Sequence, residues 1–298
     1  MDLIGEIAAL ATSFFFAFTS LIFASAGRMV GSQVTNRIRL IFALTYLVIL
    51  NFILFGEPLP LSADSSRWIW LGLSGVIGLS IGDTFYFQSL ISIGPRLGSL
   101  LLSLAPIFGS VIAWVFLGEV LTSLQITGIV LAISGIAWVV MSHEEPPNTP
   151  HGHTKRGVLF GMLAGLGQAT GLVLSKLGMF EDFSPFQANA IRMFVALLLT
   201  LTLTFVQGKA GSTFAILREK PKAIRLLALG ALIGPVFGVS SSLLAVQHTE
   251  IGTASTLMAL PPVILLPISY FVYKEKLSWQ AVAGTILAIA GVAVLFLA

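Results

Sequence analysis

The sequence contains no cysteine, which excludes a disulfide, a thiolate metal ligand and a cysteine nucleophile. It also lacks a phosphate loop and a dinucleotide fingerprint, and the serine run at 238–242 lacks the closing glycine of a nucleophile elbow. One cluster of metal-binding residue types matches no closed ligand spacing: His143, Glu144, Glu145, His151 and His153. We therefore predict no catalytic site, no metal and no cofactor.

Charged residues are scarce as well. Only 10% of the 298 residues are charged, 56% are hydrophobic and the mean hydropathy is +0.96, whereas a soluble domain carries roughly 25% charged residues. The apolar runs have the length needed to cross the hydrocarbon core of a bilayer, about twenty residues. We predict an all-α integral membrane protein with the lipid bilayer as partner. The net charge of +3 does not indicate a nucleic-acid partner, because the basic residues gather at segment ends on one side.

What the sequence does contain is a repeat. A shift of 156 residues superposes matching glycines, prolines and glutamates, among them Gly78 and Gly234, Gly82 and Gly238, Pro106 and Pro262, Glu119 and Glu275. Nearer the start of each copy, Asn36-x-x-Arg39 matches Asn189-x-x-Arg192 at a shift of 153. Such a fixed period indicates an internal duplication. We predict two repeats, 1–142 and 157–298, joined by a polar linker, 143–156.

Each repeat contains five apolar segments, so we expect ten transmembrane helices: 5–26, 35–55, 68–91, 97–117, 124–141, 157–177, 186–206, 224–247, 252–273 and 279–297. An odd number of crossings makes the second copy enter the membrane from the opposite side, which predicts two inverted five-helix repeats. The first segment is not read as a signal peptide, because Asp2 and Glu6 make its start acidic and the run is too long.

The positive charges predict an orientation. Of the 16 Lys and Arg residues, 13 lie at connections 1–2, 3–4, 5–6, 7–8 and 9–10, and 2 lie on the other face. Positively charged connections stay in the cytoplasm. We therefore expect a multi-pass protein of the plasma (inner) membrane with both termini outside.

Two ionisable residues lie deep in apolar segments. Asp83 stands in segment three, where a charge costs about 3 kcal/mol or more and needs a partner, a proton or a water-filled cavity. It is a candidate for proton coupling or for binding a substrate ammonium, and a structural ion pair is the alternative; its match in the second copy is Val239. Arg192 is a candidate for binding a substrate carboxylate or for pairing with Asp83. Snorkelling to the interface is its alternative, as for Arg39.

Further candidates are polar residues and prolines at membrane depth. Gln88 is expected near the face of Asp83, and Gln168 and Ser241 are suited to line a polar cavity or to bond between helices. Pro106 and Pro262 are predicted to lie in the middle of their helices and to bend them by removing a backbone donor. Interrupted helices at matching positions point to a binding site in inverted-repeat transporters. A structural kink without substrate contact is the alternative.

A third group of residues has a predicted structural role. Small residues recur at four-residue spacing and are expected to form packing faces or a sliding surface between two states, namely Gly78, Gly82, Gly234 and Gly238. Glu119 and Glu275 each follow an apolar segment and precede the next one. We read them as caps that accept hydrogen bonds from the next helix.

The most specific motif is LISIGPRLGSLLLSLAPIFGSVIAWVFLGE at 90–119, followed by Leu121-Thr122-x-x-Gln125 and matched by the stretch that ends in Tyr273-Lys274-Glu275. With these motifs the chain resembles the EamA-type transporters of the drug/metabolite transporter superfamily. The second copy departs from the pattern with Pro261-Pro262 and with Lys274 where Gly118 stands. The resemblance implies a transporter, often an exporter, of amino acids, other small metabolites or toxic compounds, with a cavity between the halves. It also implies cytoplasmic termini, the opposite of the charge count.

We expect a secondary transporter of a small metabolite, such as an amino acid or an amphipathic compound, that works by alternating access. Because no ATP-binding motif is present, a gradient must drive it, either of protons through Asp83 or of the substrate. The expected partner is a small molecule, and the expected state is a monomer or a homodimer. A passive facilitator or channel and a non-transporting scaffold are the alternatives. A membrane-embedded enzyme would need an acid, base or metal cluster, and only Asp83 is available.

Overall fold

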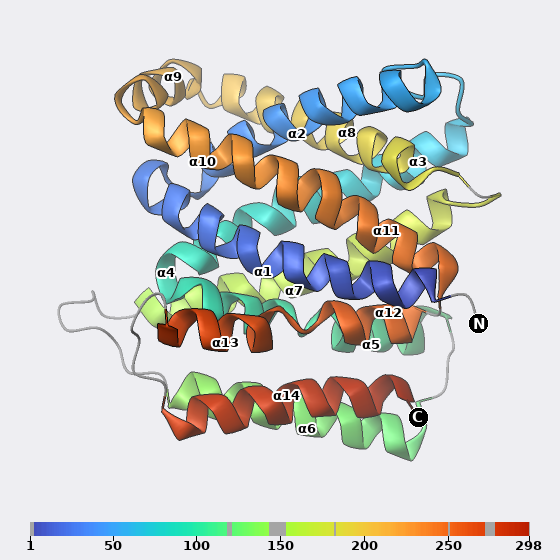
Figure 1. Cartoon of the computed structure of the whole chain (residues 1–298), viewed down its shortest axis with the longest axis vertical. Helices are drawn as coiled ribbons and strands as arrows, with labels where there is room; N and C mark the ends of the chain where they lie inside the picture. The colour runs from blue at the N-terminus through green and yellow to red at the C-terminus, as the bar shows by residue number, and fades with distance from the viewer. Residues whose placement is uncertain are drawn as a thin grey trace.

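A computed structural model of the chain describes residues 3–117, 121–142, 153–181, 183–249, 251–271 and 278–297 (Figure 1). Glu119, Glu275 and residues 143–152 of the predicted linker lie outside the described residues. Within these ranges all regular secondary structure is helical. The all-α prediction is therefore confirmed for the described part of the chain.

The helices lie side by side across the molecule, and α1 begins at the same side at which α14 ends (Figure 1). In chain order the elements are α1 (Ile4–Val30), α2 (Ser32–Phe55), α3 (Ser65–Ser74), η1 (Gly75–Gly82), α4 (Asp83–Leu102), α5 (Ala105–Leu117), α6 (Ser123–Met141), α7 (His153–Gly178), α8 (Pro185–Val206), α9 (Ala210–Glu219), α10 (Pro221–Ala231), η2 (Leu232–Gly238), α11 (Val239–His248), α12 (Ile251–Met258), α13 (Pro261–Phe271) and α14 (Trp279–Leu297). The elements η1 and η2 are π-helical and continue the helices on either side of them.

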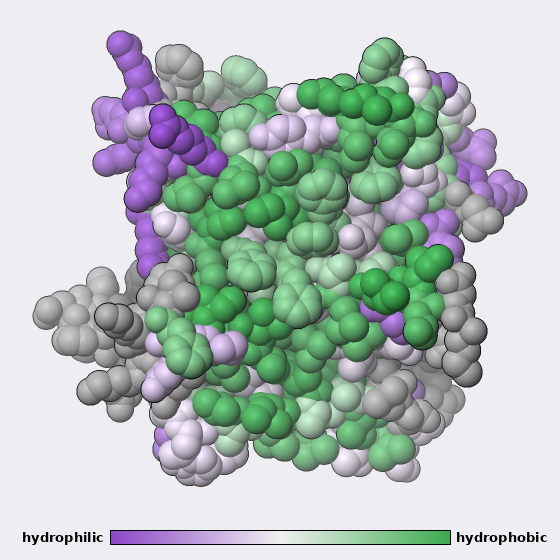
Figure 2. Space-filling view, viewed as in Figure 1, coloured by the Kyte–Doolittle hydropathy of each residue, from purple (hydrophilic) through white to green (hydrophobic). Residues whose placement is uncertain are grey.

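The outer surface is suited to lipid. Among the described residues, eight helical stretches are long and apolar enough to cross a membrane. Large apolar side chains such as Phe52, Ile53 and Val206 are exposed, and green hydrophobic residues cover the middle of the view in Figure 2. Exposed apolar surface of this extent marks a membrane contact. The chain is a multi-pass membrane protein, whereas the count of ten crossings stays a prediction.

At two places a single glycine reverses the direction of the chain between consecutive helices. Gly31 alone joins α1 to α2 with φ 83°, and Gly94 has φ 82° inside α4. An L-residue with a side chain rarely adopts such a φ. Gly94 therefore divides α4 into two helices, and Pro95 begins the second, where a missing N–H does no harm.

The expectation that Pro106 and Pro262 lie in the middle of continuous helices is wrong. Each is the second residue of its helix, α5 or α13, after a two-residue break in the segment. Proline fits the first turn of a helix because the N–H there has no intrahelical partner. The break frees carbonyl groups of the preceding helix, and the Ser13 hydroxyl donates to one of them, the Leu257 oxygen.

The predicted glycine faces lie on the π-helices and meet neighbouring helices closely. A Cβ at Gly78 or Gly82 would lie 3.6 Å or 3.5 Å from the Cα atoms of Gly171 or Gly167 in α7. On η2, a Cβ at Gly234 would lie 2.9 Å from Thr19 Cγ2, and one at Gly238 3.0 Å from Phe16 Cε1, both in α1. The glycines thus bring η1 against α7 and η2 against α1. The helices α6 and α14 also lie side by side (Figure 1), with Gly291 against Ala132.

Candidate functional site

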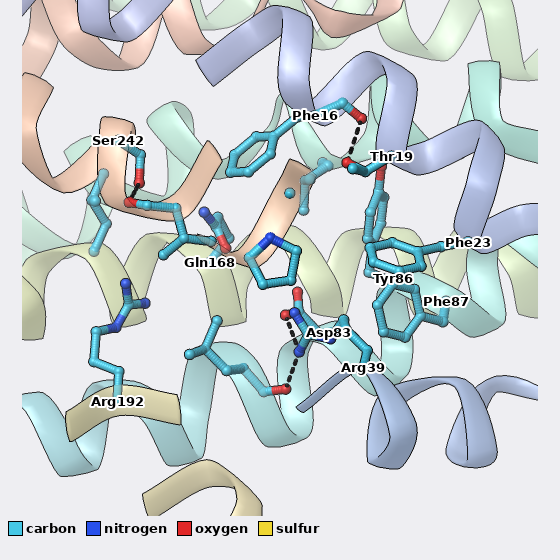
Figure 3. Close-up of a pocket in the computed structure, with 16 residues that line it drawn as sticks. Phe16, Thr19, Phe23, Arg39, Asp83, Tyr86, Phe87, Gln168, Arg192 and Ser242 are labelled. Atoms are coloured by element: carbon cyan, nitrogen blue, oxygen red, sulfur yellow. Dashed lines mark hydrogen bonds and ion pairs between the residues drawn. The ribbon is translucent and has the colours of Figure 1, made fainter. Parts of the chain in front are cut away.

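A cavity lies between residues of both predicted halves (Figure 3). Its walls come from α1, α2, η1 and α4 on one side of the linker and from α7, α8, η2 and α11 on the other. The polar side chains in the lining are Thr19, Arg39, Asp83, Gln168, Arg192 and Ser242. The aromatic ones are Phe16, Phe23, Tyr86 and Phe87.

The partner of Asp83 is Arg39. Arg39 Nη2 lies 2.8 Å from Asp83 Oδ2, and the two side chains are 3% and 17% exposed. The Arg39 guanidinium also stands 5.2 Å from the centre of the Phe87 ring, a cation–π distance. The alternative in which Asp83 forms a structural pair with a basic residue therefore describes this structure, and Arg192 is not that residue. Arg39 does not snorkel, because it is buried.

Asn36 forms hydrogen bonds both to the Arg39 guanidinium and to carbonyl oxygens of η1. Its Oδ1 accepts from Arg39 Nε at 3.2 Å and from Nη2 at 2.8 Å, and Arg39 Nη2 also donates to the Leu79 oxygen at 3.1 Å. Asn36 Nδ2 lies 3.1 Å from the Leu79 oxygen, 2.9 Å from the Ser80 oxygen and 2.8 Å from Thr84 Oγ1. A π-helical stretch departs from the regular α-helical hydrogen-bond ladder. The amide and guanidinium groups of α2 supply donors to carbonyls there.

Arg192 lies in the cavity lining without such partners. It is 3% exposed, its Nε has no hydrogen-bond partner, and no hydrogen bond or ion pair to its guanidinium occurs among the described residues. In Figure 3 the guanidinium points up toward the cavity and stands apart from the Arg39–Asp83 pair. Asp83 is near enough to attract Arg192 electrostatically without touching it. Arg192 does not snorkel either.

Asn189 reproduces part of the Asn36 arrangement. Its Nδ2 donates to the Pro235 oxygen at 2.7 Å and to Ser240 Oγ at 3.0 Å, which match Leu79 and Thr84 at the 156-residue shift. The Asn189 Oδ1, however, has no partner. The second half repeats the asparagine contacts to the π-helix but not the arginine contact.

The remaining sequence candidates divide into two groups. Gln168 lies in the cavity lining. The described lining does not include Gln88, Ser241, Pro106 or Pro262. Gln88 instead accepts from Ser32 Oγ at 2.8 Å and donates to Ser92 Oγ at 3.2 Å, which ties α4 to the start of α2. Ser242, the neighbour of Ser241, faces the cavity instead.

Sequence reasoning missed the role of Arg39 and the aromatic side of the cavity. The matching Asn-x-x-Arg motifs contained a signal for Arg39, because they placed it in the same structural position as Arg192. The aromatic residues had no signal of their own, since phenylalanine is frequent throughout the chain, with 22 copies.

Comparisons with known proteins agree with this architecture. The model of the EamA-like transporter family matches residues 3–141 and, a second time, residues 155–297. A curated protein of Clostridium kluyveri, described as an uncharacterized transporter, is 25% identical over 146 residues, which are 48% of this chain and 45% of that protein. The match thus spans about half the length of that relative. One solved crystal structure covers 98% of this chain and 96% of its own with a TM-score of 0.65 at 16% identity, so the two share a fold. With family matches over nearly its whole length, this chain belongs to the EamA-like transporter family and thereby to the drug/metabolite transporter superfamily.

Proposed function

We propose that this protein is a secondary transporter that moves a small polar or amphipathic metabolite, such as an amino acid, through the central cavity. The observation that carries the proposal is a cavity, with walls from both halves, that has Arg39, Asp83 and Arg192 in its lining among apolar helices. Ionisable groups inside a membrane are costly and mark substrate or ion pathways. A cavity between helices is also the usual place for a small-molecule site.

Alternating access follows from the proposed inverted repeat of two halves, 1–142 and 157–298, with ten crossings. Three observations support that repeat. The family model matches the chain twice, η1 and η2 stand at equivalent positions, and Asn36 and Asn189 bond to them in similar ways. In such proteins the two repeats rock around a site at their interface. The cavity has walls from both halves, as this mechanism requires.

The proposed location is the plasma membrane, with the basic connections in the cytoplasm and the termini outside. The proposed driving force is a gradient of protons or of the substrate. Asp83 is the candidate coupling residue, because it is an acid in the cavity lining and its partner Arg39 would lose its counter-charge if Asp83 took up a proton. Proton uptake would thereby weaken a contact between α2 and α4.

The test is flux into liposomes that contain the purified protein. Amino acids, organic acids and amines are each offered with and without an imposed pH gradient, to wild type, Asp83→Asn and Glu181→Gln. Glu181 is the matched control, because its side chain is 81% exposed and its pair with Arg67 lies outside the cavity. We expect saturable flux that the gradient accelerates in wild type and Glu181→Gln but not in Asp83→Asn.

Other outcomes are equally informative. Saturable flux that ignores both the gradient and Asp83→Asn would contradict proton coupling and leave a facilitator. Flux that rises linearly without saturation would indicate a channel. Absence of flux for every class of solute would contradict the transport proposal, provided that Asp83→Asn and wild type elute as folded protein.

A further inference from the structure

Arg192 and Arg39 occupy matching positions, 153 residues apart, but only Arg39 is paired. Arg39 bonds to Asn36, to a carbonyl of η1 and to Asp83. The position that matches Asp83 is occupied by Val239, which also lines the cavity. The second half therefore presents the arginine without the carboxylate that accompanies it in the first half.

Two buried atoms are left without a partner by this difference, Arg192 Nε and Asn189 Oδ1. In the first half the matching atoms, Arg39 Nε and Asn36 Oδ1, bond to each other at 3.2 Å. The Arg192 side chain is turned toward the cavity instead (Figure 3). Burial of a guanidinium without hydrogen-bond partners costs free energy. A ligand that accepts hydrogen bonds from Arg192 removes this cost and therefore binds more tightly.

The charges of the cavity specify the sign of that ligand. Its described lining holds two guanidinium groups, of Arg39 and Arg192, and one carboxylate, of Asp83. Asp83 already contacts Arg39 and lies apart from Arg192. One positive charge thus remains uncompensated in a site surrounded by apolar helices. A single negative charge on the ligand balances it, and the planar guanidinium fits a carboxylate in a bidentate way.

The other side of the cavity is aromatic. Phe23 and Phe87 line it, and their rings meet edge to face with centres 5.0 Å apart, and Phe16 lines the cavity as well. In Figure 3 Phe23 and Phe87 lie on the side of the cavity away from Arg192. Burial of an apolar group against these rings adds affinity without charge.

We propose that the cavity takes an amphipathic monocarboxylate, with its carboxylate on Arg192 and its apolar part against Phe16, Phe23 and Phe87. This proposal rests on the proposed transport function and names the substrate class of the same site. It selects organic acid anions over amines and over neutral compounds of the same shape.

The test compares probes that share a benzyl group and carry a negative, a neutral or a positive polar group. Phenylacetate, phenylacetamide and 2-phenylethylamine are titrated into the purified full chain, and the dissociation constant and the unfolding temperature are measured. We expect phenylacetate alone to raise the unfolding temperature of wild type. Because hydrogen bonds to charged groups are strong, Arg192→Gln should weaken phenylacetate binding by about ten- to a hundredfold. Arg67→Gln is the matched control and should bind like wild type, since Arg67 contacts Glu181 outside the cavity.

A second variant tests the missing counter-charge without a ligand. Val239→Asp restores the acid that the first half has at the matching position, and Val239→Asn is its uncharged control. We expect Val239→Asp to raise the unfolding temperature relative to Val239→Asn and to abolish phenylacetate binding. In the Arg192→Gln background the aspartate should no longer stabilise, because its partner is absent.

Several results would overturn the proposal. These are equal binding of phenylacetamide, unchanged phenylacetate binding in Arg192→Gln, absence of phenylacetate binding to wild type, or a preference for phenyl phosphate, a dianion. The transport proposal fails separately. Flux of neutral or cationic solutes without phenylacetate binding would remove only the anion site, whereas phenylacetate binding without any flux would remove only transport.

Discussion

The buried Arg39–Asp83 pair offers the sharpest test of how this fold is stabilised. Asp83→Asn leaves the Arg39 guanidinium, 3% exposed, with its bonds to Asn36 and Leu79 but without a counter-charge. Removal of one partner of a buried ion pair costs about 3 to 5 kcal/mol of unfolding free energy. Arg39→Met should cost at least as much, because it also leaves the Asn36 Oδ1 without its donor.

The double variant separates charge from packing. Arg39→Met with Asp83→Leu removes both charges at once, and such replacements of buried pairs are often neutral or stabilising. If each single variant costs about 3 to 5 kcal/mol and the double variant is near neutral, the coupling energy is about 6 to 10 kcal/mol. The two single costs should therefore not add. The pair of Arg67 and Glu181 is the control, with an N–O distance of 3.4 Å and an exposed carboxylate. For an exposed pair the coupling should be below about 1 kcal/mol.

The assay is reversible unfolding of the full chain in mixed micelles with a titrated denaturing detergent, for each single variant and each double variant. We expect the coupling energy of the buried pair, Arg39 and Asp83, to exceed clearly that of the exposed pair, Arg67 and Glu181. If the two coupling energies agree within error, or if the double variant loses as much stability as the sum of the single ones, the ion pair does not stabilise α2 against α4.

Two further comparisons use the same assay. Interhelical hydrogen bonds in membranes contribute about 0.6 kcal/mol each. The two N–H groups of Asn36 Nδ2 are shared among three acceptors on η1 and α4, and those of Asn189 Nδ2 go to two acceptors. Asn36→Ala should therefore cost about 2 kcal/mol and Asn189→Ala about 1 kcal/mol; a reversed order would contradict this assignment. Gly291→Ala should cost about 1 to 3 kcal/mol by overpacking, because the new Cβ would overlap the backbone of Ala132. Gly109→Ala, with nothing within 4 Å of its Cβ, should instead stabilise by up to about 1 kcal/mol; equal effects at the two glycines would refute the packing argument.

Much of the architecture was predictable because its signals are local or periodic. Low charge and long apolar runs require a membrane, and the 156-residue shift marks equivalent positions without any knowledge of the fold. The depth of Asp83 and Arg192 in their apolar segments also indicated that both need special surroundings, and the structure lines its cavity with both.

The prolines show where local reasoning ends. A proline in an apolar segment either kinks the helix or begins a new one, and the sequence does not distinguish the two outcomes. The structure begins α5 and α13 there, and a neighbouring side chain, Ser13, donates to a carbonyl freed before Pro261 and Pro262. At the break before Pro261 and Pro262 this donor comes from another helix, 244 residues away along the chain.

The sequence by itself determined the membrane class, the family, the equivalence of Arg39 with Arg192 and the absence of an acid at Val239. Only the tertiary structure decided that Asp83 pairs with Arg39, that Arg192 stays free of hydrogen bonds among the described residues, and that phenylalanines form one side of the cavity. The physical reason is that this ion pair joins side chains of two different helices, α2 and α4, which must come within about 3 Å of each other. Such contact depends on how helices rotate and cross, which periodicity along one segment does not specify.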